Sequence, residues 1–187
     1  MTAHPPLFHK LYGPALTLLP APIQKLHNVV EPLTVHGAAR IEIGTSWLAR
    51  LTSKLLSFPP PGDDVPLVLI MTPDRKGERW ERSFGGHKMT TRLMPGTSRA
   101  KVEEHLWPFV ATSEVVPDED GVDQHLTGLK CLGLSLPRAL WPRISVREGS
   151  DGSHYTFSMA IRFPWGTQLI RYDGWLDTAN LKPLKIG

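Results

Sequence analysis

The sequence predicts a mainly β protein of the α+β class. We expect a strongly curved antiparallel sheet or β-barrel of about eight or nine strands, with short N-terminal helices and one amphipathic helix packed on it. Three observations support this prediction. Segment 154–176 alternates apolar and polar residues on both sides of a tight turn, as two antiparallel strands do. The chain contains 18 prolines and 16 glycines, which favour turns over long helices. Most connections between the strand-like segments are too short for parallel crossovers.

Residues 1–30 are expected to form two or three short helices. Apolar residues recur through this segment, but Pro14, Pro20 and Pro22 interrupt them. Proline lacks the N–H group that a helix interior needs, so one long helix is excluded. A strand follows at 35–43, where apolar and polar residues alternate up to a glycine.

A helix is expected over residues 45–57, with Thr45 or Ser46 as its N-terminal cap and three prolines after it. The apolar residues that recur at helical spacing are Trp47, Leu48, Leu51, Leu55 and Leu56, while Arg50 and Lys54 face away. Such a cationic, amphipathic helix could associate with a membrane surface. Packing on the sheet is favoured, because a sheet of this size needs a covering layer.

From residue 63 onward the chain is predicted to form successive strands. They are expected near 65–71, 79–84, 89–94, 102–115, 122–132 and 143–149, before the terminal hairpin of 154–176. Gly85 and Gly86 form a tight hairpin turn, and an acidic turn at 117–121 separates the two longest strands. A short helical turn is expected at 137–140. The whole chain, 1–187, is then one domain with antiparallel β structure over 33–178 and an irregular tail at 179–187.

The terminal hairpin carries the clearest alternation. On its first strand Tyr155, Phe157, Met159, Ile161 and Phe163 share one face. On the return strand Tyr172 lies on one face, while Arg171, Asp173 and Trp175 lie on the other. A face that mixes charged and aromatic residues is either a solvated rim or the lining of a cavity, and the sequence leaves both open.

The composition restricts the class of protein. With 187 residues, of which 41% are hydrophobic, the chain can bury roughly 70% of its unfolded surface. No run reaches the roughly 18 apolar residues of a membrane span, and the first residues do not resemble a secretory signal. The single cysteine, Cys131, fits a reducing compartment, so we expect a soluble, cytoplasmic protein. The 21 basic residues are interleaved with 18 acidic ones, which argues against nucleic-acid binding.

Three motifs resemble domain-of-unknown-function family 4166. They are Gly77-Glu78-Arg79-Trp80-Glu81-Arg82-Ser83-Phe84-Gly85-Gly86, Leu134-Ser135-Leu136-Pro137-Arg138-Ala139-Leu140-Trp141-Pro142 and Arg171-Tyr172-Asp173-Gly174-Trp175-Leu176. Segments 11–23 and 55–60 are similar to the family as well, so the resemblance runs along nearly the whole chain. It implies a bacterial protein without an assigned activity and without catalytic residues to transfer. Members of the family occur alone or joined to a dinucleotide-binding domain similar to saccharopine dehydrogenase or short-chain reductases, and we expect this chain to be the stand-alone form.

Arginines on strands are the main candidates for a binding site. Arg82 shares a face with Trp80 and Phe84, and Arg171 shares one with Asp173 and Trp175. An inward guanidinium must be paired, because burial of an isolated charge costs several kcal/mol. Either it binds the carboxylate or phosphate of a hydrophobic ligand, or it pairs across strands with Glu78, Glu104, Glu148 or Asp173. The candidate ligand-binding residues are therefore Trp80, Arg82, Phe84, Arg171, Tyr172, Asp173 and Trp175.

The sequence shows no diagnostic metal or cofactor motif. Of the eight histidines, His87, His105, His125 and His154 fall on predicted strands or their ends, but none has the spacing of a metal site. No phosphate-binding glycine loop and no Gly-x-Ser-x-Gly elbow is present, and Cys131 is expected to be a buried, inert thiol. We therefore expect no metal and no cofactor.

Three functions remain open. The first is a β-cup that binds a hydrophobic carboxylate or lipid-like molecule, with Met89, Phe157 and Met159 completing its wall. The second is an accessory module for a separate, dinucleotide-dependent reductase-like protein. The third is an acid/base enzyme that uses the same cavity. We rank ligand binding first and regard enzymatic activity as the least expected of the three.

Overall fold

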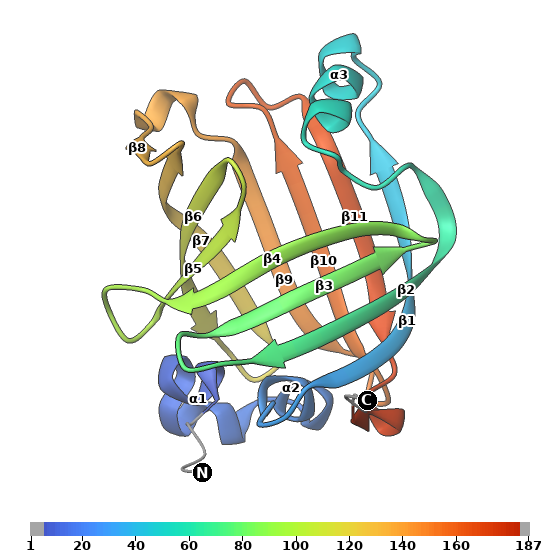
Figure 1. Ribbon diagram of the computed structural model, residues 1–187, viewed down its shortest axis with the longest axis vertical. Coiled ribbons are helices and arrows are strands. Elements are labelled where there is room, and N and C mark those ends of the chain that lie inside the picture. Colours follow the sequence, from blue (N-terminus) through green and yellow to red (C-terminus); the bar gives the residue numbers. More distant parts are fainter. Residues whose placement is uncertain (1–5, 184–187) are drawn as a thin grey trace.

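The computed structural model describes residues 6–183, which form a closed antiparallel β-barrel with helices at both ends (Figure 1). Each of its ten strands pairs with its neighbours in chain order, and the last pairs with the first. The strands are β1 (Leu33–Ile43), β2 (Gly62–Pro73), β3 (Glu78–Phe84), β4 (His87–Pro95), β5 (Lys101–Leu106), β6 (Phe109–Pro117), β7 (Val122–Cys131), β9 (Arg143–Ser150), β10 (Tyr155–Arg162) and β11 (Gln168–Leu176). Two short strands, β8 (Leu134–Ser135) and β12 (Lys182–Pro183), pair with β7 and β1.

The predicted fold class is confirmed, but the strand count was slightly too low. Segment 102–115, expected as one strand, is a hairpin made of β5 and β6 with Trp107 and Pro108 at its tip. Proline cannot donate a hydrogen bond to a sheet ladder, which places Pro108 outside the strands. Residues 179–183 are also more ordered than expected, because β12 pairs with Leu33 and Thr34, and the rest of the expected tail, 184–187, lies outside the described residues.

The barrel closes where β11 pairs with β1. Seven residue pairs join these strands, from Gly37 opposite Leu176 to Ile43 opposite Ile170. A side-chain carbon placed on Gly37 or Gly174 would overlap the backbone of the facing strand. Two glycines therefore allow the closest approach at the seam, and closure leaves no long unpaired edge in the barrel.

Three short helices close one end of the barrel, which we call the closed end. They are α1 (Leu7–Tyr12), η1 (Gly13–Leu18) and α2 (Ala21–His27), and Pro14 and Pro22 stand in the first turns of the latter two. Their apolar side chains belong to the core: Leu7, Phe8, Leu11, Leu16, Ile23 and Leu26 are buried. The expected short N-terminal helices are thus confirmed, and they lie against the end of the barrel (Figure 1).

The opposite end carries the other set of strand connections, and we call it the mouth. Its five connections are residues 44–61, 85–86, 107–108, 132–142 and 163–167. The first contains the helix α3 (Trp47–Leu55), whose N-cap Ser46 accepts a hydrogen bond of 3.1 Å from the Ala49 amide, as the sequence predicts. The fourth contains the short helix η2 (Arg138–Leu140) at the expected place.

Helix α3 packs on the barrel with a different face from the one that its sequence suggests. Ala49 and Ser53 are buried, whereas Trp47, Leu51 and Leu55 are exposed. The reason is the small size of the residues at the contact: Ala49 approaches Gly44, whose amide donates a hydrogen bond to the Leu169 carbonyl. Small side chains let the helix backbone come close to the wall, and the large apolar residues are left outside.

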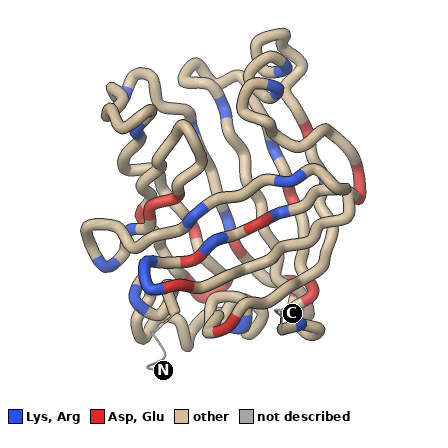
Figure 2. Tube along the Cα trace, in the orientation of Figure 1, with Lys and Arg blue, Asp and Glu red and all other residues tan. Residues whose placement is uncertain are grey.

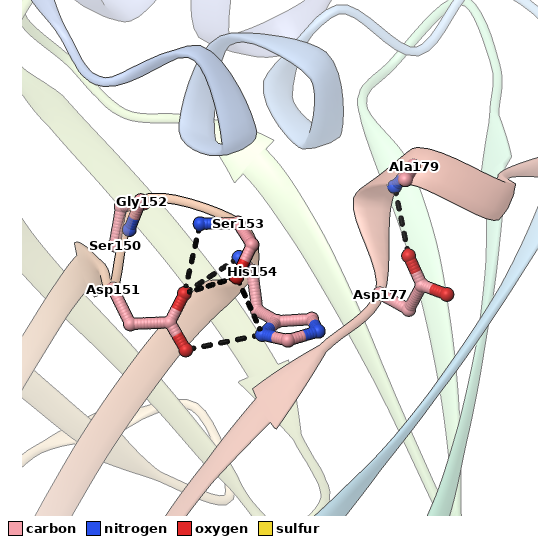
Figure 3. Close-up of polar contacts among 7 residues, drawn as sticks. All are labelled: Ser150, Asp151, Gly152, Ser153, His154, Asp177 and Ala179. Carbon is pink, nitrogen blue, oxygen red and sulfur yellow. Dashed lines mark hydrogen bonds and ion pairs between the residues drawn. The ribbon is translucent and has the colours of Figure 1, made fainter.

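The turns at the closed end are fixed by aspartates (Figure 3). The Asp151 carboxylate accepts hydrogen bonds from the amides of Ser153 and His154 and contacts the His154 ring at 3.0 Å. Asp177 caps the one-turn helix η3 (Thr178–Asn180) by accepting from the Ala179 amide. Such short side-chain bridges favour aspartate in tight turns.

Candidate functional site

The barrel interior holds two adjoining cavities. The inner cavity, near the closed end, has a volume of about 90 Å³ and is bounded by Phe8, Trp80, Phe84 and Phe157. The outer cavity, near the mouth, has a volume of about 250 Å³ and is bounded mainly by apolar residues such as Phe58, Leu129 and Ile161. Glu104, Met159 and Tyr172 line both cavities, so these three side chains form the boundary between them.

Arg82 faces the inner cavity, beside Glu104 of this boundary. Its side chain is 16% exposed, stands 5.0 Å from the centre of the Trp80 ring and donates a hydrogen bond of 2.8 Å to the Thr91 hydroxyl. The Glu104 carboxylate is 3.6 Å away, which is too long for a hydrogen bond. Arg82 is therefore partly neutralised and keeps donor capacity toward the cavities.

Tyr172 separates the two cavities. Its hydroxyl donates to the Met159 sulfur at 2.6 Å, and its ring lies 5.8 Å from that of Phe84 and 6.2 Å from that of Phe157. Burial raises the pKa of Tyr172 to about 12, with Arg82 opposing the shift and Glu104 adding to it. The buried surroundings of Tyr172 therefore disfavour its ionised form.

A buried polar cluster forms the floor of the inner cavity. His27 of α2 is 0% exposed, and its Nε2 atom lies 2.8 Å from the Glu148 Oε2 atom of β9, at ion-pair distance but without good hydrogen-bond alignment. Gln124 donates a hydrogen bond of 2.9 Å to the other Glu148 oxygen. The His27 ring also packs on Phe8, with ring centres 3.8 Å apart. The cluster thus joins the closing helices to the barrel wall.

Glu78 and two tyrosines extend this cluster. Glu78 is fully buried and accepts a hydrogen bond of 3.0 Å from the Trp80 indole. Burial raises the pKa of Glu78, while the bond from Trp80 and the charge of His27 oppose the shift. Burial, followed by the Glu148 carboxylate, raises the pKa values of Tyr12 and Tyr155 well above the ordinary value. The closed end therefore concentrates acidic groups in a medium that disfavours their ionised forms.

The remaining candidates from the sequence lie outside the barrel. The Arg171 side chain is 47% exposed and binds Asp173 through two hydrogen bonds of 2.7 and 3.0 Å. Burial alone would raise the pKa of Asp173, but the hydrogen bonds from Arg171 and Ser158 outweigh burial and lower this pKa. Trp175 is exposed on the same outer face and packs near His154. The geometry supports the alternative in which Arg171 pairs with an acidic neighbour. Arg171, Asp173 and Trp175 line neither cavity.

The structure thus brings together four of the seven sequence candidates, Trp80, Arg82, Phe84 and Tyr172. His27 was not singled out from the sequence, and Glu148 was named only as a partner for an arginine. A signal for Glu148 was present, because it continues the inward stripe of Ile144 and Val146 at a spacing of two. His27 follows the buried Ile23 by one helical turn, which marks it as a core position.

Within residues 6–183, no group of three or more His, Cys, Asp or Glu side chains is arranged to hold a metal ion. None of the helices in that described part of the chain is long and apolar enough to cross a membrane.

The fold and its interior define the class: a closed, ten-stranded antiparallel β-barrel with a largely apolar internal cavity. The chain belongs to the family described as Domain of unknown function (DUF4166), whose model matches residues 19–176, most of the chain. The resemblance drawn from the three motifs is therefore confirmed. Neither the comparison with curated proteins nor that with solved structures finds a match.

Proposed function

We propose that the protein binds a hydrophobic small molecule with one acidic head group, the head at Arg82 and the apolar part in the outer cavity. One observation carries this proposal. Among the described residues 6–183, Arg82 is the only basic side chain that lines either cavity, and it lines the inner one beside Glu104, which borders both. A guanidinium with free donors beside an apolar cavity is suited to a carboxylate attached to an aliphatic or aromatic body.

The long separation of Arg82 from Glu104 supports the same proposal. An ion pair with N and O atoms 3.6 Å apart is weaker than a bidentate pair, so a ligand carboxylate could take the place of Glu104 beside the guanidinium. Thr91 would stay as the fixed partner that orients Arg82, because its hydroxyl already accepts from the guanidinium at 2.8 Å. The partly exposed Glu104 side chain has room to turn away.

Binding of straight-chain carboxylic acids of increasing length, with the matching alcohols and amines, tests the proposal by titration calorimetry. We expect the parent protein to bind the acids. The Arg82→Gln variant should lower the affinity for acids about tenfold to a hundredfold, the range for a hydrogen bond to a charged group. Glu104→Gln should raise the affinity for acids and lower the affinity for amines, because it removes the carboxylate that competes with an acid for Arg82. Arg171→Gln, on the outer wall, is the matched control and should change nothing. Equal binding of acids to the parent protein and to Arg82→Gln would contradict the proposal.

Acid/base catalysis in the same barrel is a second candidate, favoured by the position of Glu148. Its carboxylate lines the inner cavity and is held by Gln124 on one side and approached by His27 on the other. A carboxylate oriented in this way could act as a base toward a bound molecule. Mass spectrometry of a bound ligand after incubation tests this: conversion should occur with the parent protein and cease with Glu148→Gln, and an unchanged ligand rules it out.

A further inference from the structure

The exposed apolar side chains of the protein are concentrated at the mouth of the barrel. Of the twelve large hydrophobic residues found exposed among the described residues, eight lie in its connections. They are Trp47, Leu51, Leu55, Trp107, Leu132, Leu134, Leu140 and Trp165. Single exposed hydrophobic residues are ordinary, but their concentration at one end of a molecule marks an interaction surface.

Helix α3 contributes a row of these residues. Trp47, Leu51 and Leu55 are four residues apart, so they stand above one another on one face of the helix. The helix contacts the barrel through Ala49 and Ser53, which leaves the row pointing to solvent. Trp107 is the most exposed of the set at 85% and stands at the tip of the β5–β6 hairpin. In Figure 1, α3 and β8 lie at the same end of the barrel, opposite α1 and α2.

The connections at the mouth carry basic residues in excess of acidic ones. The five connections contain no Asp or Glu, and the basic residues in them or next to them are Arg50, Lys54, Lys88, Lys130, Arg138, Arg143 and Arg162. Glu42 and Asp63 stand as close to a connection as Lys88 and Lys130 do, and both pair with Arg40. In Figure 2 the loops around α3 and β8 carry blue segments, and red segments lie on the adjoining parts of β1 and β2. At the closed end, acidic residues occupy the turns at 118–121 and 151–154, while the turn at 74–77 combines Asp74 with Arg75 and Lys76.

The mouth is continuous with the outer cavity. Thr52 and Leu56 of α3, Leu140 of η2 and Phe163 line this cavity from the same connections that expose their apolar neighbours to solvent. An apolar phase outside the mouth would therefore adjoin the connections that line the cavity. This continuity favours a lipid phase as the occupant of the surface.

We propose that the mouth docks onto the surface of an anionic lipid bilayer, with Trp47, Trp107 and Trp165 at the level of the headgroups. Tryptophan is enriched at that depth of a bilayer, and basic side chains gain about 1 kcal/mol each near an anionic surface. Arg50 and Lys54 flank the apolar row and reach headgroup phosphates while their stems stay in the apolar layer. Docking serves the transfer of a ligand into the barrel, and in that respect it rests on the proposed function.

Co-sedimentation with vesicles tests the docking. One set contains phosphatidylcholine alone, and the other contains phosphatidylcholine with phosphatidylserine. We expect binding to the anionic set, weakened by salt, and binding at least tenfold weaker to the neutral set. The triple variant Trp47→Ser, Leu51→Ser, Leu55→Ser and the charge variant Arg50→Glu, Lys54→Glu should each lose at least tenfold in affinity. The control variant Val116→Ser, Trp175→Ser removes exposed apolar residues away from the mouth and should bind like the parent.

The substitutions replace exposed side chains, and near-ultraviolet circular dichroism verifies that the barrel is intact. Absence of binding to the anionic vesicles overturns the proposal, as does binding that the mouth variants and the wall control reduce equally. A purified protein partner that loses affinity with the mouth variants, while vesicle binding stays unchanged, overturns it in favour of a protein interface. Acid binding in free solution is measured separately, so vesicle docking without any ligand affinity refutes the proposed function and leaves the docking supported.

Discussion

The contact between His27 and Glu148 gives the sharpest test of how the closed end is held. Both side chains are buried, their nearest atoms are 2.8 Å apart, and they join α2 to β9. Replacement of His27 by Ala removes the partner of a buried carboxylate and the ring that packs on Phe8. Loss of one partner from a buried pair destabilises a protein by about 3–5 kcal/mol, and we expect a loss in that range here.

A double-mutant cycle isolates the pair from the packing. Glu148→Gln keeps the shape of the side chain and an acceptor for Gln124, so its loss reflects mainly the missing charge. If the two groups interact directly, the double variant His27→Ala, Glu148→Gln should be more stable than the sum of the single losses predicts, by about 1.5–3 kcal/mol. Urea unfolding at neutral pH, followed by tryptophan fluorescence, measures the four free energies.

Additive losses would refute this reasoning. A coupling energy below about 0.5 kcal/mol would mean that His27 contributes through packing alone and that the 2.8 Å approach to Glu148 has no energetic consequence. A Lys25→Ala variant, at an exposed position of the same helix α2, serves as the local control and should change stability little.

Three further predictions concern stability. Because burial raises the pKa of Glu78, the parent should lose stability as pH rises above the ordinary value of 4.5, and Glu78→Gln should remove that loss in thermal unfolding at several pH values. The hydrogen bond from Arg147, opposed by burial, lowers the pKa of Asp118 from 3.8 to about 2. The stabilising effect of the ionised Asp118 is therefore present above pH 3.8 and lost as the pH falls toward 2. In acid titrations of unfolding, Asp118→Asn should show a smaller decline in stability over this window than the parent does. Ala49→Leu should overfill the contact of α3 with the barrel and cost about 1–3 kcal/mol in urea unfolding, whereas the same change at the exposed Arg50 should cost little.

Local sequence patterns predicted the strands well because most strands have one apolar and one polar face. Alternation in β3 and β10 placed Trp80, Arg82, Phe84 and Phe157 correctly inside the barrel. The same patterns do not show where a tight turn divides an extended segment. The hairpin of β5 and β6, with Trp107 and Pro108 at its tip, was therefore predicted as a single strand.

The sequence was less informative where tertiary contacts decide the outcome. Helical spacing grouped Trp47 with Leu48 as a packing face, but the close approach of Ala49 to Gly44 turned the helix by about one position. Alternation likewise separated Arg171 from Tyr172 without showing which of the two faces the interior. The contact of His27 with Glu148 joins residues more than a hundred positions apart, and no local pattern encodes such a pairing.

The two ends of the barrel differ in how much it costs to open them, and this difference supports access through the mouth. Opening the closed end would expose Phe8, Ile23 and Leu26, each worth roughly 1.5–3 kcal/mol when fully buried, and would separate His27 from Glu148. At the mouth, Ala49 and Ser53 are the fully buried residues of α3, and Leu48 and Leu56 are half-buried, so moving the helix exposes less buried apolar surface. A ligand that exchanges between the outer cavity and its surroundings should therefore pass beneath α3, on the side where the apolar and cationic residues gather.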